Sequence, residues 1–182
     1  MMELQGAIGI AQLSQLDEMI AAQKKNKAAM RNSISKLPGV TFRILVDEEG
    51  DSATFLAFFL PSREKAKAVN RILQDNGAGA ISFADNAWHY YPNWEHIMNG
   101  STVTDNDWPF KDQVGRRRVV YDPHNLPESA EIMNRLLVYQ VPVNLSEERL
   151  QQIVADVEQA SAEITSWVTH IAYGVSLRPP PV

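Results

Sequence analysis

The first stretch of the chain is free of proline from Met2 to about Lys36, and its apolar residues follow the period of an α-helix. The repeating apolar positions are Leu4, Ile8, Ala11, Leu13, Leu16 and Ile20. A continuous helix of this length would measure about 50 Å. The sequence therefore predicts a long N-terminal helix that a small domain cannot cover alone.

The start of this helix lacks a capping residue. No Ser, Thr, Asp or Asn stands before Glu3, and the apolar pattern already runs at the first residues. Because Gly6, Ala7 and Gly9 have small side chains or none, another backbone could approach the helix closely there. We expect residues 1–37 to be a linking helix that continues from a segment upstream.

The composition excludes several classes of protein. The net charge of −5 argues against a general nucleic-acid binder, which normally has a basic surface. The chain has no cysteine, which excludes disulfides and thiolate metal sites. No apolar run has the roughly 18–20 residues that cross a bilayer, and no signal peptide is recognisable. We expect a cytoplasmic protein without a membrane or nucleic-acid partner.

Two strands and a helix are predicted after Leu37-Pro38-Gly39. Residues 40–46 alternate, with Val40, Phe42, Ile44 and Val46 on the buried face. Residues 53–60 are apolar on both faces, as in a central strand, and would pair with 40–46 as an antiparallel hairpin. A helix over 63–74 follows, with Ala66, Val69, Ile72 and Leu73 facing inward.

Residues 80–124 show no clear periodicity. Short strands are conceivable at 81–83 and 119–121, but most of the segment is aromatic, polar and irregular. It contains three of the four tryptophans and three of the four histidines. Long irregular segments inside a compact domain are uncommon and are often functional.

Regular structure resumes at Leu126. The pattern predicts a helix to about Leu137, an extended segment over 138–143, and a last helix from Glu147 to about His170, opened by a capping box that begins at Asn144. The fold class is α+β: a small antiparallel sheet, with strands near 40–46, 53–60 and 138–143, covered by helices. We assign 38–175 to this domain and 176–182 to a loose proline-rich tail.

Three pieces of the chain, in this order, resemble the C-terminal part of one enzyme family. They are residues 3–13, His89-Tyr90 with His96, and the run Leu126-Pro127-x-Ser129-Ala130-Glu131, Val141-Pro142-Val143 and Ser146-Glu147-Glu148. The order resembles the DegT/DnrJ/EryC1/StrS family of sugar aminotransferases that depend on pyridoxal phosphate, and it covers roughly residues 2–165. The resemblance implies the C-terminal small domain of a fold-type-I transferase.

The same resemblance implies where the cofactor belongs. Fold-type-I enzymes hold pyridoxal phosphate on a lysine and an aspartate of the large domain, which would precede residue 1 here. None of the seven lysines of this chain stands in the strand-to-loop setting that the cofactor lysine needs. We therefore expect a chain that is inactive alone and binds no cofactor alone. The implied partners are the missing large domain and a second copy, since the family builds its active sites at a dimer interface.

Candidate site residues cluster in the aromatic segment. His89, Tyr90, Trp94 and His96 are the substrate-binding candidates, because rings can cover a sugar face while imidazole and phenol bind its hydroxyls. The alternative is an aromatic cluster that only packs the loop. No third ligand with suitable spacing accompanies the histidines, so no metal site is expected.

Two further sets of residues are candidates at the edges of the domain. Arg118, in the run 116–118, could contact the phosphates of a nucleotide-linked sugar, although a solvated basic edge is the alternative. Glu3 and Gln5 are interface candidates, at a boundary between domains or subunits.

Three functions stay open at this point. The first is part of an aminotransferase that moves an amino group from glutamate to a keto- or aldo-sugar. The second is part of a dehydratase of the same fold, in which a histidine replaces the cofactor lysine. The third is a free-standing interaction domain without catalysis.

Overall fold

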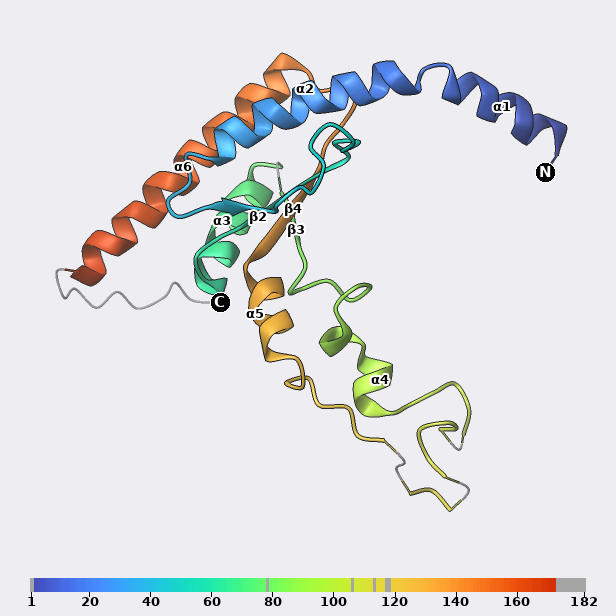
Figure 1. Ribbon diagram of the computed structural model, residues 1–182. Coiled ribbons are helices and arrows are strands. Elements are labelled where there is room, and N and C mark those ends of the chain that lie inside the picture. Colours follow the sequence, from blue (N-terminus) through green and yellow to red (C-terminus); the bar gives the residue numbers. More distant parts are fainter. Residues whose placement is uncertain (1, 78, 106, 113, 117–118, 173–182) are drawn as a thin grey trace.

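A computed structural model describes residues 2–77, 79–105, 107–112, 114–116 and 119–172 (Figure 1). The longer elements, in chain order, are α1 (Glu3–Leu13), α2 (Leu16–Ile34), β1 (Thr41–Phe42), β2 (Phe55–Phe59), α3 (Arg63–Asp75), β3 (Ile81–Ser82), α5 (Pro127–Arg135), β4 (Leu136–Gln140) and α6 (Glu147–Ala172). Between β3 and α5 lie the short helices η1 (Tyr91–Asn93) and α4 (Glu95–Asn99).

The four strands form one antiparallel sheet in the order β1-β2-β4-β3. Residues far apart in the sequence meet at its centre, where Ala57 of β2 and Ile81 of β3 both stand opposite Val138 of β4. The hairpin of β1 and β2 is confirmed, with Thr41 opposite Phe59. This small antiparallel sheet with covering helices confirms the α+β class.

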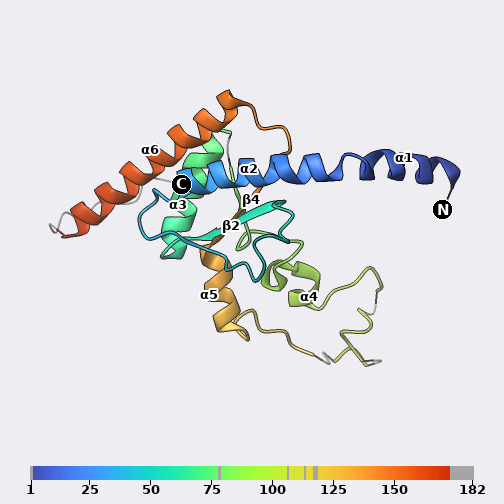
Figure 2. The same cartoon turned by 45° about the horizontal axis from the view of Figure 1, so that its top comes forward.

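The core lies between the sheet and the helices α2, α3 and α6. α2 and α3 contact the strands, and α6 packs against both of these helices (Figures 1 and 2). The side chains that are almost fully buried there include Met30, Ile34, Leu56, Phe58, Leu73, Leu137, Val157 and Ile164. Removing this apolar area from water stabilises the domain.

The helix predicted over 63–74 is confirmed in α3. The Ser62 hydroxyl accepts a hydrogen bond from the Lys65 amide at 3.3 Å, which caps the first turn. All four inward positions, Ala66, Val69, Ile72 and Leu73, are buried. The last predicted helix is also confirmed, as α6.

The prediction of one continuous N-terminal helix is wrong. The helix ends at Leu13 and begins again at Leu16, so α1 and α2 are separate elements. The Ser14 hydroxyl donates to the Ala11 carbonyl at 2.8 Å, a local bond that competes with helix continuation. Among the described residues α1 buries none of its side chains.

The predicted strand over 40–46 is too long, because regular pairing stops at Phe42. Ile44 and Val46 are 88% and 103% exposed, so their assignment to the buried face is also wrong. The chain beyond Arg43 instead turns toward α2, where Lys27 pairs with Asp51. A tertiary contact thus overrides the local alternation.

Two further boundaries differ from prediction. The helix expected to reach Leu137 ends at Arg135, and the strand expected over 138–143 runs from Leu136 to Gln140. Pairing with β2 begins at Leu136, which draws that residue out of the helix. The segment 81–83 contributes β3, whereas 119–121 forms no strand.

No helix within the described ranges is long and apolar enough to cross a membrane. The tail assigned to 176–182 lies outside the described residues, as does the end of the domain after residue 172.

Candidate functional site

The aromatic segment leaves the sheet after β3. Its two short helices, η1 and α4, lie away from the sheet, and the chain returns to it only at α5 (Figure 1). α4 ends at Gly100, whose φ of 60° is the left-handed conformation that favours glycine. The predicted substrate-binding residues therefore lie on the segment between β3 and α5, which extends away from the core and is called the excursion below.

Two asparagines organise the start of this excursion. The Asn86 side-chain oxygen accepts hydrogen bonds from the amides of Trp88 and His89, both at 2.8 Å. The Asn93 amide group donates to the Ala84 carbonyl at 2.8 Å and to the Asn86 carbonyl at 3.2 Å. Neither residue was predicted from the sequence to be functional. An asparagine that bonds the amide two residues on is typical of a turn, and this was the available signal.

The four aromatic candidates lie in this unit, and each has its own surroundings. His89 is exposed and stacks on Phe83, with ring centroids 6.2 Å apart. Tyr90 is half-buried and contacts Tyr91 edge-on at 6.4 Å. Trp94 is half-buried directly before α4, and His96 is exposed on that helix.

No hydrogen bond or ring contact joins these four side chains within the described part of the chain. The exposed imidazoles of His89 and His96 are available to a ligand that approaches from outside. The described residues contain no group of three His, Asp or Glu side chains that could hold a metal ion. The chemistry open to the segment is thus hydrogen bonding and ring stacking.

The remaining predicted site residues are not brought to this segment. Arg118 lies outside the described residues. Glu3 and Gln5 are exposed on α1, where the Gln5 side-chain oxygen accepts a hydrogen bond from the Met2 amide at 2.9 Å. Gln5 therefore closes the first turn of α1 in place of an ordinary capping residue.

The lysines do not fit a Schiff-base site for pyridoxal phosphate. Lys27 is buried and bound to Asp51, and Lys36 pairs with Glu158 at 3.0 Å. All seven are on helices, at the end of a helix or in a loop, and none follows a strand of the sheet: Lys24, Lys25, Lys27, Lys36, Lys65, Lys67 and Lys111. The residues of this chain therefore do not hold the cofactor in the way that fold-type-I enzymes require.

Comparison with known proteins decides the family. The sequence model of the DegT/DnrJ/EryC1/StrS aminotransferase family matches residues 1–158, which is most of the chain. The chain belongs to this family. The three resembling pieces, at residues 3–13, 89–96 and 126–148, all lie within the matched range.

A solved structure supports the same assignment at the level of fold. The crystal structure of the aminotransferase TlmJ from Streptoalloteichus hindustanus matches with a TM-score of 0.57 and 16% sequence identity. The match covers 87% of this chain but 36% of TlmJ. This DegT/DnrJ/EryC1/StrS family member thus corresponds to one part of an aminotransferase fold.

Proposed function

We propose that the chain is the C-terminal part of an aminotransferase that depends on pyridoxal phosphate and uses a keto- or aldo-sugar, free or carried on a nucleotide, as amino acceptor. Glutamate is the proposed amino donor. Residues 38–175 are the small domain, 1–37 link it to a large domain, and 176–182 are a tail. The observation that carries the proposal is the family match over residues 1–158 in a chain spanning about a third of TlmJ.

In this proposal the large domain supplies the cofactor and its lysine, and this chain alone is inactive. None of the seven lysines of this chain follows a strand of the sheet, which supports placing the cofactor lysine in the large domain. The complete enzyme is a cytoplasmic homodimer, in which Glu3 and Gln5 lie at a boundary between domains or subunits. The exposure of both residues on α1 is consistent with that place.

The contribution of this chain to catalysis is substrate binding. His89 and His96 donate hydrogen bonds to sugar hydroxyls, while the rings of Tyr90 and Trp94 lie against the sugar. Arg118 binds a phosphate of the carrier. Both imidazoles are exposed, that of His89 on an ordered turn and that of His96 on α4, which supports this role.

The DNA upstream of the Met1 codon tests the proposal directly. An open reading frame for a large domain with a cofactor lysine is the expected result. A histidine at that position would instead make the protein a dehydratase of the same fold. A stop codon just upstream would overturn the catalytic proposal and leave a free-standing interaction domain.

The substrate role predicts separable kinetic effects in the complete enzyme. His89→Ala and His96→Ala should each lower kcat/KM for the sugar by about 2- to 10-fold, the worth of one hydrogen bond between neutral groups. The reaction with glutamate alone should stay unchanged. His124→Ala, an exposed histidine elsewhere on the excursion, is the control. Equal losses with both substrates would argue for a folding defect and against substrate binding.

A further inference from the structure

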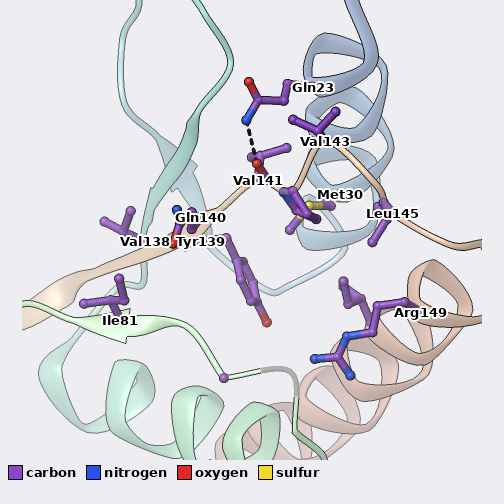
Figure 3. A pocket seen from close by; sticks show the side chains of 13 residues that line it. Gln23, Met30, Ile81, Val138, Tyr139, Gln140, Val141, Val143, Leu145 and Arg149 are labelled. Carbon is purple, nitrogen blue, oxygen red and sulfur yellow. Dashed lines mark hydrogen bonds between the residues drawn. The ribbon is translucent and has the colours of Figure 1, made fainter. Parts of the chain in front are cut away.

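A cavity of about 530 Å³ lies away from the aromatic segment, between α2, the end of β4 and the first turns of α6 (Figure 3). Its apolar wall includes Met30, Leu145 and Ile153, and its polar lining includes Tyr139 and Arg149. This volume is in the range of small-molecule sites, which are mostly apolar with a few placed polar groups.

One wall of the cavity is held by side-chain amides of α2. The Gln23 amide group donates to the Val141 carbonyl at 2.8 Å (Figure 3). The Asn26 amide group donates to the carbonyls of Pro142 and Val143, both at 2.9 Å. Three hydrogen bonds therefore fix the segment after β4, so this wall is present before any ligand arrives.

The wall at Gly79, next to Ala80 and directly before β3, is held in the same way. The Asn70 side-chain oxygen accepts a hydrogen bond from the Ala80 amide at 3.1 Å. Gly79 packs so closely on Gln74 that a Cβ there would lie 2.4 Å from the Gln74 Cγ. Arg149 reaches across from α6 and donates to the Gly77 carbonyl. Gly79, α6 and the segment after β4 thus border a preformed pocket that is partly open to solvent.

Arg149, which is exposed at the mouth, is the one charged side chain among the described residues that line the cavity. Arg149 pairs with no carboxylate within the described residues, and no Asp or Glu lines the cavity. Burial, and after it the nearby Asp156 carboxylate, raise the pKa of the Tyr139 hydroxyl, which therefore stays neutral at neutral pH. A guanidinium that carries one carbonyl bond has donors left for an anion, and its planar fork matches a carboxylate.

We propose that this cavity binds a small monocarboxylate with an apolar body. The carboxylate pairs with Arg149, and the apolar body lies against Met30, Leu145 and Ile153. The site shares no residue with His89, Tyr90, Trp94, His96 or Arg118. It therefore stands whether or not the chain is part of a sugar aminotransferase.

The test is a titration of the 182-residue chain with three probes, followed by amide chemical shifts in NMR. Hexanoate carries both the charge and the apolar body, hexanol lacks the charge, and acetate lacks the body. Hexanoate should cause saturable shifts at Gln140, Val143 and Arg149, with a Kd at least about tenfold below that of either other probe. Absence of saturable shifts with hexanoate, or shifts only elsewhere, would overturn the proposal.

Two variants locate the binding. Arg149→Met keeps an apolar side chain but removes the charge. It should raise the Kd of hexanoate about tenfold or more, to a value similar to the Kd of hexanol. Arg63→Met, at an exposed arginine on α3, is the matched control and should leave binding unchanged. Val143→Trp, at a half-buried wall position, should block both probes by filling the cavity. Undiminished hexanoate binding in either the Arg149 or the Val143 variant would contradict the assignment.

Discussion

The ion pair between Lys27 and Asp51 is the residue-scale contact that redirects the chain after β1. Lys27 lies on α2, and the side chains of the pair are only 11% and 19% exposed. The hydrogen bond from Lys27 is the main reason that the pKa of the Asp51 carboxyl is lowered from its usual 3.8. Lys24 adds a bond to the Glu49 carbonyl. Together these lysines hold the acidic loop 47–51 against α2.

Asp51→Asn should lower the free energy of unfolding at pH 7 by about 2 kcal/mol, because it leaves the Lys27 ammonium buried without its counter-charge. A lowered pKa means that the stabilisation is present above pH 3.8 and is lost as pH falls through the folded-state pKa. The difference between wild type and variant should therefore narrow below pH 3.8. Urea unfolding at several pH values measures both effects.

The control for this prediction is a second ion pair of a lysine with a carboxylate, which lies on the surface. Lys36 and Glu158 have side chains 49% and 60% exposed. Glu158→Gln should change the free energy of unfolding by less than about 0.5 kcal/mol, since exposed pairs are weak. A loss equal to that of Asp51→Asn would mean that burial does not set the strength of these pairs.

At the scale of elements, the break between α1 and α2 is local in origin. Ser14 bonds the Ala11 carbonyl, and the Gln15 amide turns back to the Gln12 carbonyl at 3.1 Å. Asp17 and Glu18 then stand in the first turn of α2, where the positive end of the helix dipole favours them. The end of α1 and the start of α2 are thus separated by only two residues, Ser14 and Gln15.

Ser14→Ala should extend helical structure across residues 13–16, because it removes the competing hydroxyl and introduces the best helix former. Carbon-13 Cα chemical shifts of residues 13–16 measure the change. Ser35→Ala is a matched control, since the Ser35 hydroxyl makes the same bond to the Asn32 carbonyl at 2.7 Å. Pro38 stops that helix regardless, so no extension is expected there. Unchanged shifts at 13–16 would place the cause of the break elsewhere.

At the scale of the whole molecule, α1 has the apolar sequence of a buried helix, yet its side chains are exposed to solvent. It projects beyond the sheet and the other helices (Figures 1 and 2). Its sequence is apolar on most sides, with Glu3 as its only charged residue. Leu4 and Ile10 are 69% and 72% exposed. Helices of this kind normally lie inside a larger structure.

The isolated chain should therefore self-associate through α1 and elute from a sizing column above its 20.4 kDa mass. Replacing Leu4 and Ile8 together by Glu should restore a monomer, because charge on this surface opposes its burial. Gln12→Glu adds the same charge on the same helix outside these positions and should leave association largely intact. A wild-type chain that elutes as a monomer would favour a free-standing domain.

Local patterns in the sequence predicted the elements whose stability is local. The Ser62 cap and the apolar period of 66–73 act over one or two turns, so they determined α3 without knowledge of the rest of the fold. The hairpin and the α+β class followed from patterns of similar range. The family resemblance, carried by residues 3–13, 89–96 and 126–148, was confirmed by the match over 1–158.

Only the tertiary structure decided which surfaces these elements present. Ile44 alternates as a buried strand residue should, yet the loop contact with Lys27 leaves it in solvent. The preformed cavity depends on Gln23 and Asn26 bonding carbonyls more than 100 residues away. In the sequence these two are ordinary polar residues of a helix. Periodicity records interactions between near neighbours, whereas pairings across such separations form only when the whole chain has folded.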